Sequence, residues 1–472
     1  MRSDISPPPL KRQRLTRPAA ESNVPDIPKF TPLSSPTPGA LRIFVWNVNG
    51  IEPFVQPYIQ KSIKSFFKSA TDTRGTAKRK RMQYTGDFTS DSGDEATVSG
   101  SGDGTEDLSR QGPASLRLIL KRYGWPHLLL LQEVKIKPGD LKTMSAVRQA
   151  VNDASGITGN ESDQKSAKFS EQTMKKEEML ADGGPEYEVR FTLPADPYNA
   201  KGFGGKVYGV AAIVRKDFMS EAVQDIRDVP WDREGRIQII ETRKIGLPLD
   251  SDYGIRPTST SPDANEAGPE ATKFKFAIIH IYAVNGTSNP YRSTHTGEDS
   301  GTRHDRKLAV HTELLVEARA LEAKGFHVII AGDLNIARCE LDGYPNLRTR
   351  PYQHVLNRSD FNKKFFMDAA IDMNRPKASY SGFEKRISGA GNIQGLNAID
   401  TFRHIHGSKR RYSYHSRGLP WGSSCDRVDL IIASRSLASN IVAAGICDSP
   451  RDRGPSDHCP VWVEIGLQDE AL

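Results

Sequence analysis

Several polar residues of this sequence lie next to short apolar runs, at positions where a buried strand would begin or end. Six such positions occur, at Asn47, Glu133, Tyr282, Asp333, Asp429 and the pair Asp457–His458. Polar side chains on loops held by a rigid sheet are typical of active sites. Each of them alone could be a turn or cap residue. Six of them in one chain favour a functional site.

These side chains suit the hydrolysis of a phosphodiester. That reaction needs neutralised charge on the phosphoryl oxygens, a positioned or deprotonated water and a stabilised leaving oxygen. Carboxylate and carboxamide oxygens are good ligands for Mg²⁺, and Glu133 and Asn47 fit this role. His458 could place a charged donor on the phosphate if a carboxylate holds its ring. That partner need not be the adjacent Asp457, because sequence neighbours on an extended chain point apart, and Asp429 is an alternative.

The elements that must position these residues are short strands and one clear helix. Apolar residues at helical spacing predict a helix over residues 305–324. Buried strands are expected at Leu41–Asn47, His127–Leu131, Val207–Val214, Gln238–Thr242, Phe274–Tyr282, Phe326–Ala331, Val428–Ala433 and Val461–Ile465. The sequence shows no internal repeat of short fixed period.

Long polar stretches interrupt this pattern. Residues 1–40 are rich in Pro, Ser and Arg, which predicts a disordered basic tail. The basic cluster at Lys11–Arg14 is either a nuclear import address or part of a solvated tail. Polar insertions are expected at about 70–112, 153–185, 246–272 and 286–303. We therefore predict a single domain over residues 41–467.

Charge and cysteine content narrow the class of protein. The 472 residues carry 65 Lys and Arg against 58 Asp and Glu, a net charge of +7 that suits a polyanionic partner or a solubilising surface. The four cysteines form no C-x-x-C pair, which disfavours a zinc site and favours a reducing compartment. No apolar stretch approaches the roughly 20 residues that span a bilayer. We expect a soluble intracellular protein with no membrane partner.

Four sequence blocks, in the right order, resemble the signature of the endonuclease/exonuclease/phosphatase superfamily. They are Trp46–Ile51, Leu131–Lys135, Gly332–Asn335 and Ser456–Pro460. Further stretches resemble the exonuclease III branch of apurinic/apyrimidinic (AP) endonucleases, namely Asp400–His404, Arg427–Ser434, Ile281–Gly286 and Trp231–Arg236. The resemblance is spread over residues 41–467 and is interrupted by the polar insertions.

The resemblance implies an α/β fold, a four-layer αββα sandwich of two mixed sheets with outer helices. It assigns catalytic roles to Tyr282, Asp333, Asn335, Asp429 and His458, metal binding to Asn47, Glu133 and Asp457, and substrate binding to Asn49, Lys135 and Asn285. In that assignment Asp333 orients or deprotonates the attacking water, and His458, held by Asp429, stabilises the phosphoryl charge. The implied cofactor is Mg²⁺, with Mn²⁺ as a substitute.

The implied activity is cleavage of duplex DNA on the 5′ side of an abasic site, which leaves a 3′-hydroxyl. 3′-Phosphodiesterase and 3′–5′ exonuclease side activities are expected with it. Asn49, His415 and Cys425–Asp426 depart from patterns found in the family. The alternatives are therefore an enzyme that mainly cleans 3′ ends or degrades from them, and a non-catalytic DNA-binding scaffold. We expect a monomer located in the nucleus, or alternatively in the mitochondrion.

Overall fold

The computed structural model describes seven stretches of the chain: residues 30–55, 115–153, 183–200, 207–245, 274–368, 370–372 and 392–467. Most of the predicted tail, with its basic cluster, lies outside the described residues. So do the insertions predicted at about 70–112 and 246–272, and most of the one at 153–185. The stretch at 286–303 is described. It contains the short strands β8 (Pro290–Arg292) and β9 (Asp299–Thr302), which pair as an antiparallel hairpin.

Two six-stranded mixed sheets make up the centre of the described part of the molecule. The first has the strand order β18 (Ile441–Ile446), β19 (Val461–Gly466), β1 (Ala40–Asn47), β2 (Leu128–Gln132), β4 (Val210–Arg215) and β3 (Tyr187–Thr192). The second has the order β14 (Ile399–Asp400), β17 (Asp429–Ala433), β10 (His327–Asp333), β7 (Phe276–Tyr282), β6 (Ile237–Thr242) and β5 (Val223–Asp228). β1 pairs with β2, and β7 with β10, in parallel.

The central strands are buried on both faces, because successive side chains of a strand point to opposite sides of the sheet. In β1, Ile43 and Val45 belong to a core that also contains Ile329 and Ala331 of β10, so this core lies between the sheets. The alternate residue Phe44 packs instead into a second core on the outer face. Strands covered on both sides need continuous apolar sequence. All eight predicted strands are present for this reason.

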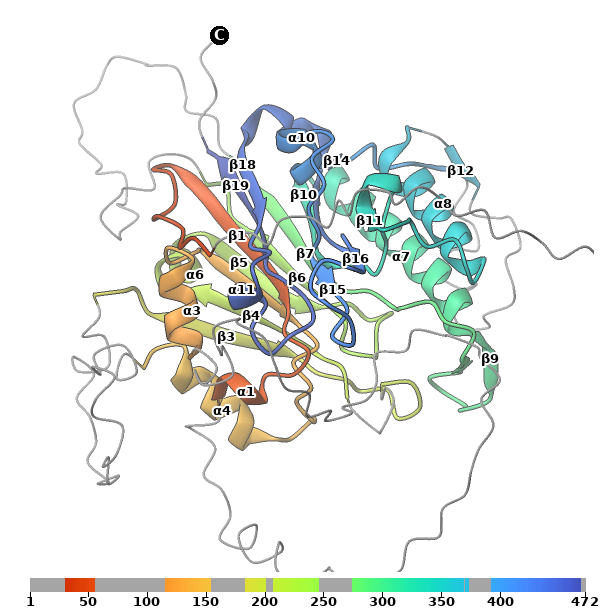
Figure 1. Ribbon diagram of the computed structural model, residues 1–472, viewed down its shortest axis with the longest axis horizontal. Helices are drawn as coiled ribbons and strands as arrows, with labels where there is room; N and C mark the ends of the chain where they lie inside the picture. The colour runs from red at the N-terminus through yellow and green to blue at the C-terminus, as the bar shows by residue number, and fades with distance from the viewer. Residues whose placement is uncertain are drawn as a thin grey trace, which may run out of the picture.

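Helices cover the outer face of each sheet. α3 (Leu116–Arg122) and α4 (Leu141–Ala150) pack on the first sheet, and α7 (Arg303–Ala323) and α8 (Gln353–Phe366) on the second (Figure 1). α7 is the predicted helix. It begins with a capping box in which the Thr302 hydroxyl accepts from the Asp305 N–H and the Asp305 carboxylate accepts from the Thr302 N–H. The predicted αββα sandwich is confirmed.

Shorter elements complete the described part of the chain. They are α1 (Glu52–Val55), α6 (Lys216–Glu221), α10 (Thr401–His406), α11 (Pro450–Arg453), the 3₁₀ turns Glu340–Asp342 and Arg435–Asn440, β11 (Gly343–Tyr344), β12 (Ala370–Asp372), β13 (Asn392–Gln394), β15 (Tyr414–His415) and β16 (Cys425–Asp426). β11, β16 and β15 form a small sheet beside the ends of the central strands (Figure 1). None of the helices in the described residues is long and apolar enough to cross a membrane.

Candidate active site

The pairing of the central strands brings the predicted site residues to one edge of the sandwich. Asp333, at the end of β10, lies opposite Tyr282 at the end of the parallel strand β7 and opposite Asp429 at the start of β17. Asn47 ends β1 in the other sheet. Its amide donates to Glu133 Oε1 at 3.2 Å and to Asp333 Oδ2 at 3.0 Å, so it links the two sheets across the site.

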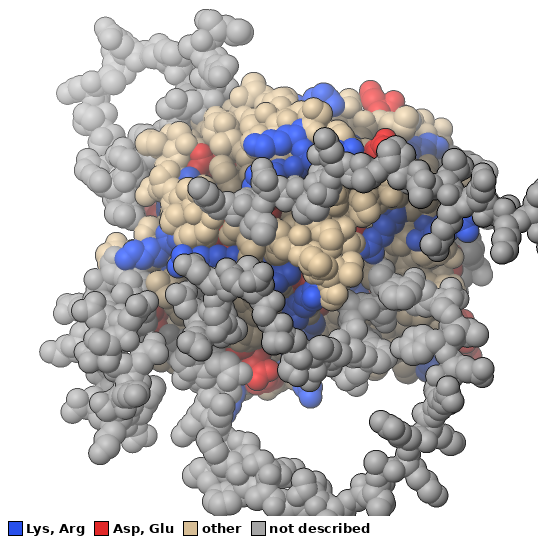
Figure 2. Space-filling model, viewed as in Figure 1, with Lys and Arg blue, Asp and Glu red and all other residues tan. Residues whose placement is uncertain are grey.

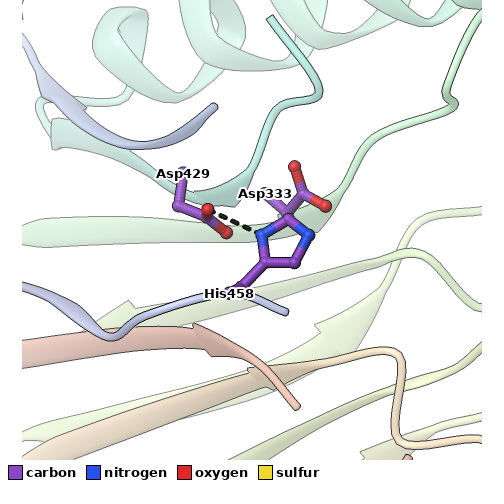
Figure 3. Close-up of side chains that lie close together, drawn as sticks. All are labelled: Asp333, Asp429 and His458. Carbon is purple, nitrogen blue, oxygen red and sulfur yellow. Dashed lines mark hydrogen bonds and ion pairs between the residues drawn. The ribbon is translucent and has the colours of Figure 1, made fainter. Parts of the chain in front are cut away.

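His458 faces two carboxylates. Its Nδ1 lies 2.8 Å from Asp429 Oδ2, so Asp429 and not Asp457 holds the ring, and Asp333 lies on the other side (Figure 3). Ser456 fixes the backbone at this point, because its hydroxyl accepts from the His458 N–H at 3.0 Å and donates to the carbonyl of Asn47 at 2.5 Å. The ring is therefore held in place by side-chain and backbone bonds.

The charges of these three groups depend on one another. Burial alone would lower the pKa of His458, but Asp429 and then Asp333 outweigh it and raise that pKa well above its ordinary value. Burial, followed by the charge on Asp429, raises the pKa of Asp333. The ring is therefore an imidazolium at neutral pH, and Asp333 is a stronger base than an exposed aspartate.

Glu133 and Tyr282 form a second contact at this edge. The Tyr282 hydroxyl donates to Glu133 Oε1 at 2.5 Å, and Lys135 Nζ lies 3.0 Å from Glu133 Oε2. Burial would raise the pKa of Glu133, but Lys135 and the hydrogen bonds from Tyr282, Lys135 and Asn47 outweigh it and lower that pKa. Glu133 is therefore an anion at neutral pH, available to a cation.

The backbone at the site is unusual. Six described residues other than glycine have positive φ, and four of them are Asn49 (51°), Glu133 (49°), Lys135 (55°) and Asn335 (51°). Such conformations cost free energy and cluster where function requires them. At Asn335 the backbone N–H donates to Asp333 Oδ1 at 2.9 Å and the side-chain amide to Asp333 Oδ2 at 3.3 Å. Asn335 thereby helps to fix the Asp333 carboxylate.

The donor chemistry fits a hard divalent cation at Glu133. The ammonium of Lys135 contacts Glu133 Oε2 and the side-chain oxygen of Asn49, so a carboxylate and an amide oxygen already share one positive charge here. Asn49 also hydrogen-bonds to the two other predicted metal residues. Its N–H donates to Asn47 Oδ1 at 3.0 Å, and its side-chain amide donates to Asp457 Oδ1 at 2.9 Å. Asn47, Glu133 and Asp457 are thus grouped around Asn49.

A second set of side chains is close enough to share a metal ion, namely Asp333, Asp429 and His458. It suits a metal less well. His458 is already bonded to Asp429, and its raised pKa keeps the ring positively charged, which repels a cation. The residues around Glu133 therefore fit a cation better than this set does. Glu133, Asp333, Asp429 and His458 together are called the carboxylate cluster below.

These groups open into one cavity of about 140 Å³. It is lined by the predicted residues Asn49, Glu133, Tyr282, Asn285, Asp333, Asn335, Asp457 and His458. Six further polar residues line it that the sequence did not mark as site residues: Arg348, His354, Asn357, Arg358, Tyr414 and Asp426. They come from α8, the loop before it and the small sheet. Of these, Asp426 is conspicuous in the sequence only as a departure from the family pattern.

Directly behind the site lies a buried ionic network, called the arginine cluster below. It consists of Arg338, Asp342, Asp400, Arg403 and Arg427. Arg427 Nε lies 2.8 Å from Asp342 Oδ1, and Arg427 Nη2 lies 2.6 Å from Asp400 Oδ2. Burial would raise the pKa of Asp400, but Arg427 and Arg338 lower it to about 2. Arg427 of this cluster lies two residues before Asp429, so the cluster holds the chain just before β17.

The sequence profile of the endonuclease/exonuclease/phosphatase family matches residues 45–458, and the chain belongs to this family. No curated protein matches the chain significantly in sequence. The family assignment agrees with the two-sheet fold and with a site at the strand ends.

Solved structures of three AP endonucleases are similar to the chain. The catalytic domain of Xenopus laevis APE2 has 15% identity and a TM-score of 0.44, with 90% of this chain and 92% of that chain covered. The Archaeoglobus fulgidus enzyme has 16% identity and a TM-score of 0.42, with 90% and 99% covered. Leishmania major LMAP has 14% identity and a TM-score of 0.46, with 93% and 93% covered.

Proposed function

We propose that this protein is a Mg²⁺-dependent AP endonuclease of the exonuclease III branch, which hydrolyses the phosphodiester 5′ to an abasic site in duplex DNA. One observation carries the proposal: Glu133, Asp333 and His458 line the same cavity, and Asp429 holds the His458 ring. The four branch-specific sequence stretches support the choice of substrate within the family. On the face seen in Figure 2, Lys and Arg side chains are spread across the middle of the molecule, which suits a polyanionic substrate.

Each of these residues has its own role in the proposed reaction. Asp333 orients a water molecule and accepts its proton as the oxygen attacks phosphorus, and its raised pKa favours that acceptance. The bond from phosphorus to the upstream O3′ breaks, so the products are a 3′-hydroxyl and a 5′-phosphate on the abasic sugar. The imidazolium of His458 stabilises the negative charge on the phosphoryl oxygens. Asn285 and Tyr282 line the same cavity and can contact these oxygens.

Mg²⁺ bound at Glu133, with Asn47 and Asp457 nearby, would supply positive charge to the phosphoryl and leaving oxygens. Glu133→Gln removes the anionic ligand but keeps the shape of the side chain. We expect the Mg²⁺ concentration for half-maximal activity to rise roughly tenfold or more. Glu188→Gln, at a half-buried position of β3 where Glu188 pairs with Arg190, is the control. An unchanged Mg²⁺ dependence for Glu133→Gln would remove Glu133 from the metal site.

A 3′-end-processing activity of the same site is the second candidate. It is favoured by the polar cavity wall, where Arg348 and Asp426 form an ion pair with 2.9 Å between Arg348 Nε and Asp426 Oδ2. A leaving group with its own charge could interact with such a wall. The same catalytic residues would serve both activities.

The proposal is tested with three DNA duplexes: one with a single abasic site, one intact, and one with a blocked 3′ end. Each is incubated with the full chain, with and without Mg²⁺. We expect incision 5′ to the abasic site in the presence of Mg²⁺ and little cleavage of intact duplex. Faster release of the 3′ block than abasic incision would favour the second candidate. Binding of all duplexes without cleavage would instead show a non-catalytic scaffold.

A further inference from the structure

One buried polar atom at the cavity wall has no hydrogen-bond partner among the described residues. Asn357 on α8 lines the cavity and is only 3% exposed. No group among the described residues donates to its Oδ1. Buried polar atoms are nearly always hydrogen-bonded, and an unpaired one costs roughly 1–3 kcal/mol. Such an exception at the wall of an active-site cavity indicates that a ligand completes the bonding.

The helix that carries Asn357 is held rigidly against the site. The guanidinium of Arg358 donates from Nε to the carbonyl of Ala337 and from Nη2 to the carbonyl of Arg348, both at 2.7 Å. Farther along α8, Asp360 pairs with Lys364 and with His311 of α7. The backbone that carries Asn357 is thus held in place, which lowers the entropy cost of using its side chain for recognition.

The turn that carries Asn285 also packs against Asn357. Gly286 has a φ of 78°, and a Cβ there would lie 2.7 Å from both Asn357 Nδ2 and Lys307 Cδ. Glycine is needed for this close approach. Asn285 is one of the residues expected to contact the scissile phosphate. With the proposed role of Asn285, this contact would place Asn357 beside the scissile phosphate and near the sugar attached to it.

Other groups on this side of the cavity are also able to bond to hydroxyls. The Asp426 carboxylate is held by Arg348, and the imidazole of His354 is kept neutral because burial lowers its pKa to about 4. A neutral imidazole can donate from one nitrogen and accept at the other. The cavity therefore presents a carboxamide, a carboxylate and an imidazole to the sugar.

We propose that this cavity recognises its sugar through a hydroxyl group on C1′ or C2′, which hydrogen-bonds to the Asn357 carboxamide. A hydroxyl both donates and accepts, so it matches both ends of a carboxamide. A natural abasic sugar in its ring form has a hydroxyl on C1′, where an intact nucleotide has its base. An abasic sugar derived from RNA also has one on C2′. Recognition by hydrogen bonding would thus distinguish a sugar without a base from an intact DNA nucleotide.

The inference rests on the proposed abasic-site activity and is tested with three duplexes of the same sequence. One contains a natural abasic site with the C1′ hydroxyl. The second contains the tetrahydrofuran analogue, which has neither hydroxyl, and the third its 2′-hydroxy form. Single-turnover cleavage by the full chain is measured for the parent, Asn357→Leu and Asn357→Asp. Ser359→Ala, at an exposed position on the same helix, is the control.

We expect the parent to cleave at least one hydroxyl-bearing duplex roughly tenfold or more faster than the tetrahydrofuran duplex, because an analogue without the hydroxyl leaves Asn357 unpaired. The duplex that is preferred identifies C1′ or C2′ as the source of the hydroxyl. Asn357→Leu should bring this ratio close to one. Asn357→Asp, which keeps the acceptor, should retain part of it, and Ser359→Ala all of it.

Equal cleavage of all three duplexes by the parent would overturn the inference and leave the proposed function standing. That result needs no substitution, so it would overturn the inference even if Asn357→Leu does not fold. A parental preference that survives in folded Asn357→Leu would also overturn it. If the parent cleaves none of the duplexes, the proposed function itself fails, and the inference with it.

Discussion

The carboxylate cluster and the arginine cluster lie side by side at the start of β17, but their charges are balanced differently. In the arginine cluster, Asp342 and Asp400 both bond to the guanidinium of Arg427, and further arginines flank them. In the carboxylate cluster, Asp333 and Asp429 share a single imidazolium. The pKa of Asp400 is accordingly lowered, and that of Asp333 is raised.

This difference in charge balance distinguishes a cluster that supports the fold from one that is suited to a reaction. Each carboxylate of the arginine cluster has a cationic partner and no opening to the cavity, so the cluster holds the strand ends in place. In the carboxylate cluster one imidazolium serves both Asp333 and Asp429, and Glu133, Asp333 and His458 border the cavity, so a metal ion, a water molecule and a phosphate can bind there. Carboxylates with a raised pKa and too few cationic partners indicate a reactive site. Carboxylates that are fully paired with arginines indicate a structural role.

The largest effect is expected for Asp333→Asn, which removes the base and keeps the shape. Loss of a group acting on the transition state should lower the single-turnover rate on an abasic duplex by roughly 10²–10³-fold or more. The same change removes the repulsion between Asp333 and Asp429, so thermal stability should be unchanged or higher. A folded variant within about tenfold of the parental rate would exclude Asp333 from catalysis.

Asp400→Asn should behave in the opposite way. It leaves the buried charge of Arg427 short of one partner, and breaking a buried pair costs about 3–5 kcal/mol. Denaturant unfolding should show this loss, whereas the rate per folded molecule should stay within about tenfold. A stable but inactive Asp400→Asn variant would mean that the arginine cluster takes a direct part in the reaction.

The two clusters should also respond to acid in different pH ranges. The pKa of Asp400 is lowered to about 2, so its stabilising contribution is present above the ordinary aspartate pKa and is lost as the pH falls from about 4 towards 2. The contribution is on the order of 2 kcal/mol. Asp333 must be ionised to act as a base, and its pKa is raised, so activity should fall at a higher pH. Melting temperature and kcat/KM measured against pH test this, and loss of both in one pH range would contradict it.

The sequence predicted the central strands because burial on both faces requires unbroken apolar runs. It missed β5 and α8 for the opposite reason. β5 is the edge strand Val223–Asp228, in which polar residues dominate, and the fourteen residues of α8 include only four that are buried. Elements with little apolar surface leave little periodicity in the sequence. Their positions depend on packing against elements that are distant along the chain.

The site was predictable where a residue directly adjoins a strand, as Glu133 and Asp333 do. Which carboxylate holds His458 could not be decided from the sequence, because it depends on the pairing of β17 with β10, which places Asp429 opposite Asp333. Asn357 could not be predicted either. It lies in the middle of a polar helix and reaches the cavity only because α8 packs on α7.

We propose that Asp333 and His458 act together on one phosphate. Single-turnover cleavage of an abasic duplex by Asp333→Asn, His458→Asn and the double variant tests it most directly. Each single variant should lose roughly 10²–10³-fold in rate. Because both groups act on the same step, the double variant should lose clearly less than the product of the two single losses. A loss equal to that product, in variants that melt like the parent, would show that the two residues act independently and would contradict the account.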